Sequence, residues 1–258
     1  MSKFKLVFTS LAMLVAVATM AGEKNRKFDI TIKGVKAESH MLACKAPEFS
    51  FHLPQMAGNF RIGIANGENS IWASDLQKVS VKENKSKLIY TLSDPLLSKG
   101  IVYVRVVGLS DSDGIVLEVE GENLPKDLQL IWSFGGCYGK VLDNPTDSKI
   151  EPSYCKYNVF NVEGSAFSVY YGESMRLRVI HGVTPLNSEI RLSDAHKQQT
   201  PLELFESGKK TDAPVLAAST PLNNNEKLYF CFYTQNKKAD YNYYMLSDLF
   251  NLRYAAVQ

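Results

Sequence analysis

The amino-acid sequence predicts an all-β fold, a large antiparallel two-sheet β-sandwich with a short helix at the C-terminus. Two observations carry this prediction. Short apolar or alternating segments recur roughly every 10 residues, and turn sequences such as Asn66-Gly67, Asp94-Pro95 and Gly135-Gly136 separate them. Before the last residues of the chain, apolar residues do not recur at helical spacing over the length of a helix. This pattern is typical of antiparallel sheets packed face to face.

The predicted strands share a period of two residues or a continuous apolar run. They are Phe28–Lys33, Phe49–Leu53, Phe60–Ile64, Val79–Lys82, Lys87–Leu92, Ile101–Val107, Ile115–Glu120, Leu128–Phe134, Ala166–Tyr171, Met175–His181 and Lys227–Tyr233.

Two segments depart from this pattern. Residues 193–210 are the most polar stretch and predict a long loop, with one helical turn at Thr200–Phe205. From Ser247 or Asp248, either of which is a good N-cap, the pattern becomes helical. The helix has two apolar stripes, one of Leu249, Leu252 and Ala256 and one of Phe250, Tyr254 and Val257. Two interpretations remain open: a terminal helix docked on the sandwich, or the first helix of a longer helical region.

The N-terminus predicts export. Lys3 and Lys5 precede an apolar run, Leu6–Ala21, that is too short for a membrane span and ends in small residues. We therefore expect a signal peptide over residues 1–21, a β-sandwich over 22–246, and the start of a helix over 247–258. The alternative for the first segment is an uncleaved N-terminal anchor. The mature protein would be periplasmic or secreted, with no membrane span after cleavage.

Composition excludes several classes of protein. The chain has 258 residues, 45% of them hydrophobic and 22% charged, which describes a globular chain and not a disordered or polytopic one. The formal net charge of +2 falls to zero once the two leader lysines are removed. A neutral chain without a basic block exerts no long-range attraction on phosphates, so we expect no nucleic-acid partner.

The four cysteines lack any C-x-x-C spacing, which excludes a zinc ribbon and a thioredoxin-like pair. In an exported protein Cys137 and Cys155 form the shortest disulfide closure. The alternative is that all four, including Cys44 and Cys231, are buried thiols.

Three motifs imitate functional sites. Gly135–Gly139 has the form G-x-C-x-G of a nucleophile elbow, but Asn144-Pro145 leaves no room for the helix that an elbow requires. Asp111–Gly114 imitates part of a calcium loop, although its flanks predict strands and favour a hairpin turn. The four histidines have no metal-ligand spacing. We predict no metal and no cofactor.

Several segments resemble the bacterial family called domain of unknown function 4450. They include Pro47–Pro54, Gly58–Ile64, Val119–Pro125 and, most specifically, the W-x-F-G-G segment Trp132–Gly136. Members of that family are longer exported proteins of polysaccharide-degrading bacteria, in which a β region precedes a helical region similar to the toroids of glycoside hydrolases. The resemblance implies a sandwich of the super-sandwich type, and it implies that residues 248–258 begin a helical domain missing from this chain.

By this resemblance the chain would pack on a helical catalytic-type domain and lend one loop to a cleft that binds a polysaccharide or oligosaccharide. We expect that loop to use rings that stack on sugars, a cation and an acid: Trp132, Phe134, Tyr138, Lys140 and Asp143. No catalytic residue can be assigned, so this chain alone is not expected to catalyse hydrolysis. The alternative is a free-standing carbohydrate-binding or structural β-sandwich.

Overall fold

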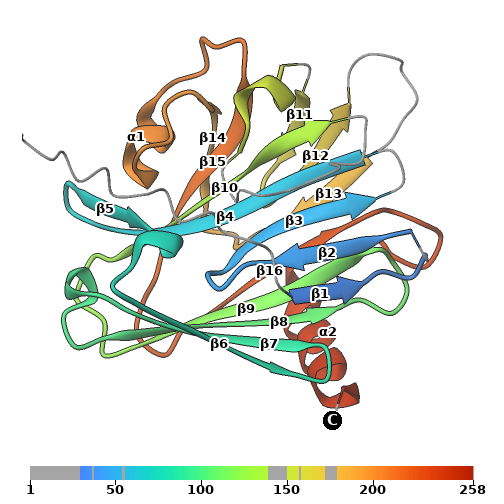
Figure 1. Cartoon of the computed structure of the whole chain (residues 1–258), viewed down its shortest axis with the longest axis horizontal. Coiled ribbons are helices and arrows are strands. Elements are labelled where there is room, and N and C mark those ends of the chain that lie inside the picture. The colour runs from blue at the N-terminus through green and yellow to red at the C-terminus, as the bar shows by residue number, and fades with distance from the viewer. Residues whose placement is uncertain are drawn as a thin grey trace, which may run out of the picture.

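The computed structural model describes residues 30–36, 38–53, 56–138, 150–156, 158–171 and 179–257. Within them two antiparallel sheets pack face to face (Figure 1), which confirms the predicted β-sandwich. No helix in these ranges is long and apolar enough to cross a membrane.

Sheet A has the strand order β1-β2-β3-β4-β10-β15-β14, and β5 pairs with the end of β4 beyond β3. Its strands are β1 (Ile30–Lys33), β2 (His40–Ala43), β3 (Glu48–Leu53), β4 (Met56–Asn66), β5 (Asn69–Trp72), β10 (Gln129–Tyr138), β14 (Glu189–Asp194) and β15 (Pro214–Pro221).

Sheet B has the strand order β11-β12-β13-β16-β9-β8-β7-β6. Its strands are β6 (Lys78–Asn84), β7 (Lys87–Ser93), β8 (Ile101–Gly108), β9 (Gly114–Glu122), β11 (Asn158–Glu163), β12 (Ala166–Tyr171), β13 (Val179–Val183) and β16 (Lys227–Tyr233). The chain passes from one sheet to the other after β5, β9, β10, β13 and β15, so neither sheet is a separate folding unit.

The core between the sheets is aromatic. Trp132 stacks on Phe167 of the opposite sheet with ring centroids 6.0 Å apart, and Phe134 stacks on Phe232 at 5.4 Å. Because every second residue of a strand points inward, the alternating strands deliver these rings to one layer. The other rings of the layer are Phe49, Phe51, Phe60 and Phe230.

Two helices cover the outer faces of the sandwich (Figure 1). Helix α1 (Pro201–Glu206) lies against sheet A, and the side chain of Thr200 caps it by accepting from the Glu203 amide at 3.2 Å. This helix confirms the turn predicted at Thr200–Phe205. Helix α2 (Tyr243–Ala256) lies against β8, β9 and β16 of sheet B. Three short 3-10 turns, η1 (Ala73–Asp75), η2 (Pro95–Leu97) and η3 (Pro152–Tyr154), complete the elements.

Strands β2, β5, β11, β14 and β15 were not predicted from the sequence. Strand β15 has Pro214, Ala217, Ala218 and Pro221 among its eight residues and is buried on both faces, so it has few of the branched residues and little of the alternation by which strands are recognised. Strand β14 ends at Asp194, inside the segment predicted as loop. The final helix begins at Tyr243 and not at Ser247, because Asn242 already caps it by accepting from the Tyr244 amide at 3.1 Å.

Candidate functional site

Strand β10 places two of the predicted sugar-stacking residues in the core. Trp132 and Phe134 are fully buried on the inner face of sheet A, and the indole nitrogen of Trp132 donates to the Thr220 hydroxyl at 3.3 Å. A ring inside the sandwich cannot stack on a sugar, so the prediction of a carbohydrate contact at these two residues is wrong. The W-x-F pattern supplies core rings because its alternation points both side chains inward.

The other predicted loop residues lie where β10 ends. Tyr138 is its last residue and pairs with Ala57 of β4 after a register shift that begins at Gly135. The side chains of Tyr138 and Cys137, and the whole of Lys140 and Asp143, lie outside the described residues. Their predicted contacts to a sugar therefore stay predictions.

The predicted disulfide is not formed in the structure, because Cys155 is a free, fully buried thiol. Its sulfur accepts from the Gly136 amide at 3.3 Å, and the left-handed φ of +66° at Gly136 favours glycine there. Burial raises the pKa of the Cys155 thiol to about 12, so this thiol stays protonated and unreactive. The alternative expectation of a buried thiol holds for Cys155.

The half-buried side-chain amide of Gln198 holds the chain at Ile150, just after the predicted loop. The Gln198 side chain accepts from the Ile150 amide at 3.2 Å and donates to the Ile150 carbonyl at 2.7 Å. The side-chain nitrogen of Gln198 also donates to the Ala195 carbonyl at 2.6 Å, and the main-chain carbonyl of Gln198 accepts from the Trp72 indole at 2.9 Å. Gln198 therefore joins its own segment to Ile150 and to Trp72 on the outer face of sheet A.

Next to this amide lies a buried ion pair. The Arg61 guanidinium on β4 donates to Glu48 on β3 at 3.1 Å and to Gln198 at 3.1 Å, with Arg61 and Glu48 exposing 2% and 0% of their side chains. Its guanidinium carbon lies 4.1 Å from the ring centre of Trp72, a cation–π contact. Sequence analysis missed this cluster. In the alternating sequence of β4, Asn59 and Arg61 are polar residues between the apolar ones, and this was the only hint of the cluster in the sequence. The pairing of Arg61 with Glu48 depends on strand register, which the sequence does not show.

Two histidines extend the polar face. His40 on β2 and His52 on β3 stack with ring centroids 4.7 Å apart, and His52 Nε2 lies 3.2 Å from the Ser50 hydroxyl. Burial, together with the neighbouring His40, lowers the pKa of His52 to about 4. His52 is therefore neutral near pH 7.

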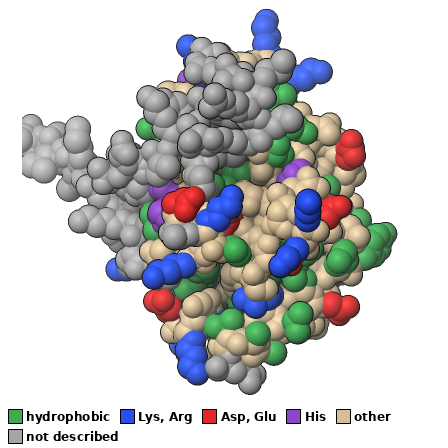
Figure 2. All heavy atoms as spheres, turned by 90° about the vertical axis from the view of Figure 1, so that its right-hand side faces the viewer, with side chains coloured by type: hydrophobic (Ala, Val, Ile, Leu, Met, Phe, Trp, Pro, Cys, Tyr) green, Lys and Arg blue, Asp and Glu red, His purple; other side chains and the backbone are tan. Residues whose placement is uncertain are grey.

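The outer face of sheet B carries a second buried carboxylate. Glu118 on β9 accepts from Arg105 at 2.5 Å, from the Tyr229 hydroxyl at 3.0 Å and from Lys227 at 3.0 Å. The Arg105 and Lys227 side chains expose 23% and 46% of their surface. This charge cluster therefore reaches the solvent, unlike the one on sheet A. On the face that Figure 2 shows, described side chains of both charge signs lie interspersed.

Helix α2 has one buried and one exposed apolar stripe. Leu246 and Phe250 are buried against sheet B, whereas Leu252 exposes 69% and Met245 45% of its surface. Tyr244 is still more exposed, at 80%. The exposed residues border a shallow groove of about 720 Å³, lined by Tyr241, Asn242, Tyr244, Met245, Asp248, Leu249 and Leu252. Of the two stripes predicted for the helix, the Phe250 stripe packs against sheet B, whereas in the other stripe Leu249 is partly buried and Leu252 and Ala256 are exposed.

Met245, Leu249, Leu252 and Ala256 follow one another at intervals of four, three and four residues. This is the spacing with which one helix packs along another. The exposed members of this series are Met245, Leu252 and Ala256.

The segment before α2 is anchored to the Asp111–Gly114 turn. The Tyr241 hydroxyl donates to Asp111 at 2.5 Å, and the Ser112 hydroxyl donates to the Thr234 carbonyl. Burial, with Asp111 beside it, raises the pKa of Tyr241, which therefore remains a donor. The acids that imitate a calcium loop thus serve as hydrogen-bond acceptors in a turn, as predicted for a hairpin.

These features define an all-β, two-sheet sandwich whose outer faces are covered by short helices and polar clusters. The model of the family described as domain of unknown function (DUF4450) matches residues 53–253, and the chain belongs to that family. This confirms the resemblance predicted from the sequence.

One solved structure with a similar fold is the crystal structure of a bacterial glucoamylase complexed with acarbose. It superposes with a TM-score of 0.55 at 10% identity, covering 88% of this chain and 34% of that chain. The chain thus spans about a third of that protein's length, and a likeness at this identity shows the fold alone. No curated protein matches the chain.

Proposed function

We propose that this chain is the exported β-sandwich domain of a carbohydrate-active, glycoside-hydrolase-like protein, and that it packs on a helical domain through α2. The observation that carries the proposal is the exposed apolar stripe of α2. Leu252 and Met245 lie on the side of the helix away from the sandwich, at the spacing that a second helix would fill.

The comparisons support the carbohydrate part of the proposal. A glucoamylase complexed with acarbose shares the fold over 88% of this chain, while 66% of the glucoamylase chain lies outside the match. In the proposal the chemistry belongs to the helical domain, and the present chain supports it. The loop that carries Tyr138, Lys140 and Asp143 would contribute to a glycan cleft at the boundary.

Helix docking is tested in the protein as its own cells make it, after its mass and its reading frame past residue 258 are determined. Leu252→Glu places a charge in the exposed stripe, and Val159→Glu is the matched control, because Val159 is a similarly exposed apolar residue on β11. We expect Leu252→Glu to split thermal unfolding into two transitions and to increase proteolysis after α2. Equal behaviour of the two variants, or a native mass below 28.8 kDa, would contradict the proposal.

The glycan contact is tested separately by titrating acarbose and soluble α-glucans. Tyr138→Ala, Lys140→Ala and Asp143→Ala should weaken binding, whereas Lys126→Ala, an exposed lysine in the turn before β10, should not. Unchanged affinity in all three variants would remove the loop from the proposal. Glycan binding by the isolated chain without turnover would instead support the free-standing carbohydrate-binding module.

Export is the remaining part. N-terminal sequencing of the protein from a periplasmic fraction should begin just after Ala18 or Ala21, the two cleavage positions that the small residues offer. A chain that begins at Met1 in the cytoplasm would contradict it.

A further inference from the structure

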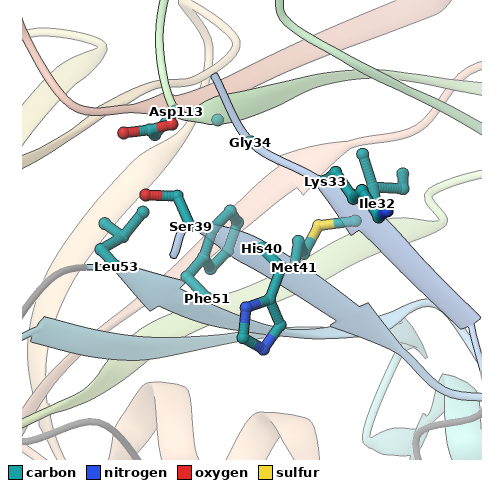
Figure 3. A pocket seen from close by; sticks show the side chains of 10 residues that line it. Ile32, Lys33, Gly34, Ser39, His40, Met41, Phe51, Leu53 and Asp113 are labelled. Atoms are coloured by element: carbon teal, nitrogen blue, oxygen red, sulfur yellow. The ribbon is translucent and has the colours of Figure 1, made fainter. Parts of the chain in front are cut away.

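A small pocket lies where the β1–β2 hairpin of sheet A meets the start of β9 in sheet B (Figure 3). It encloses about 10 Å³ and is mostly apolar, with Ile32, Met41, Phe51 and Leu53 in its wall. The hydroxyl of Ser39 and the carboxylate of Asp113 also line it. A space of roughly 10–15 Å³, measured as the volume open to the centre of a water-sized sphere, holds one water molecule.

Ser39 cannot satisfy its hydroxyl from the described residues. Its side chain exposes only 1% of its surface, and the hydroxyl oxygen has no hydrogen-bond partner among them. A buried hydroxyl without a partner destabilises the folded state, so such groups in folded proteins are as a rule bonded to protein or to ordered water.

Asp113 is also short of donors. It exposes 3% of its surface, and within the described part of the chain its carboxylate accepts one hydrogen bond, from the Lys36 amide at 2.9 Å. A carboxylate offers about four acceptor positions, and burial without donors is unfavourable for its charge.

Gly34 lies against both side chains. A Cβ atom built on Gly34 would lie 2.7 Å from Asp113 Oδ1 and 2.7 Å from Ser39 Cβ, so Asp113 Oδ1 and Ser39 Cβ are at most 5.4 Å apart. Any side chain at position 34 would clash with both residues, and glycine allows Ser39 and Asp113 to line the same pocket. A water molecule that bonds two oxygen atoms lies about 2.8 Å from each of them.

We infer that the pocket is a binding site for one internal water molecule, which donates to the Asp113 carboxylate and bonds the Ser39 hydroxyl. The water joins the edge hairpin of sheet A to the β8–β9 turn of sheet B. Since Asp111 in the same turn accepts from Tyr241, the turn then links three parts of the molecule: the edge of sheet A, sheet B and the segment before α2. This inference does not depend on the proposed function.

A crystal structure at a resolution that shows ordered water tests the inference directly. We expect one water peak within hydrogen-bond distance of both Ser39 Oγ and the Asp113 carboxylate. A dry pocket, or a direct bond between the two side chains, would overturn it.

The solution test counts long-lived internal waters by oxygen-17 relaxation dispersion. Ser39→Ala removes one of the two partners, and Ser80→Ala, on the exposed edge strand β6, is the matched control. We expect the count to fall by one in Ser39→Ala and to stay unchanged in Ser80→Ala. An unchanged count in Ser39→Ala contradicts the assignment, and the crystal structure of the unmodified chain decides it if that variant does not fold.

Discussion

The two outer faces of the sandwich surround a buried carboxylate in different ways. Each buries one glutamate, Glu48 on sheet A and Glu118 on sheet B, and each pairs it with an arginine. On sheet A the arginine is itself buried and held by an amide and an indole. On sheet B the cations reach the solvent, and α2 beside them leaves an apolar stripe exposed. The difference is one of solvent access: the ion pair on sheet A is closed off by residues of this chain, whereas the face with α2 keeps charged and apolar side chains exposed.

The largest expected effect breaks the ion pair on sheet A. Arg61→Met removes the guanidinium from the buried Glu48 carboxylate and should lower the free energy of unfolding by about 3–5 kcal/mol. Arg105→Met, on sheet B, should cost about 1 kcal/mol or less, because Lys227 remains and water reaches the site. Urea unfolding of both variants measures the difference. Equal losses of unfolding free energy in the two variants would show that the deeper burial of the ion pair on sheet A does not increase its contribution to stability.

The pH dependence of stability gives the second comparison. The folded-state pKa of His52, about 4, lies below the ordinary value of 6.5, so between these values the unfolded chain binds a proton that the folded chain does not. Stability from neutral His52 is complete above about pH 6.5 and is lost as the pH falls toward 4, by about 3 kcal/mol. Urea unfolding from pH 7 to pH 4 should show this loss in the unmodified chain and not in His52→Gln.

His181 on sheet B is the matched control for this comparison. Burial lowers the pKa of His181 as well, but the charge of Asp240 and a hydrogen bond that the ring donates to Gln235 oppose the shift, and the ring is only half-buried. His181→Gln should therefore remove less of the acid-side loss than His52→Gln. A larger effect of His181→Gln would mean that His181 on sheet B, and not His52 on sheet A, has the surroundings that oppose protonation more strongly.

The smallest expected effect lies within α2 and sharpens the contrast between its two stripes. Leu252→Ser should change the stability of this chain by no more than about 0.5 kcal/mol, because the side chain already meets solvent. Phe250→Ala should cost about 3–5 kcal/mol, because it empties the contact with Tyr229. Thermal unfolding of the isolated chain measures both, and a large cost for Leu252→Ser would mean that the stripe packs within this chain.

The sequence alone determined the layers of this protein. Two-residue alternation in segments such as Phe60–Ile64 and Lys87–Leu92 commits alternate side chains to opposite faces, so the all-β class and most strands of sheet B followed from it. The resemblance to the family rested on particular segments, above all Trp132–Gly136, and the match over residues 53–253 confirms it. Both stripes of the last helix were also visible, since helical spacing is local.

Only the tertiary structure decided whether a side chain lies in the core between the sheets or on an outer face. Trp132 and Phe134 were predicted to meet a sugar, yet they lie in the core, because a strand's pattern gives two faces without saying which one meets the other sheet. Arg61 meets Glu48 and Gln198 only after strand register and a contact 137 residues away bring them together. Phe250 is buried and Leu252 exposed because β8, β9 and β16 lie on one side of the helix only. The sequence specifies the type of each side chain, but the neighbours that determine what the side chain does come from other strands.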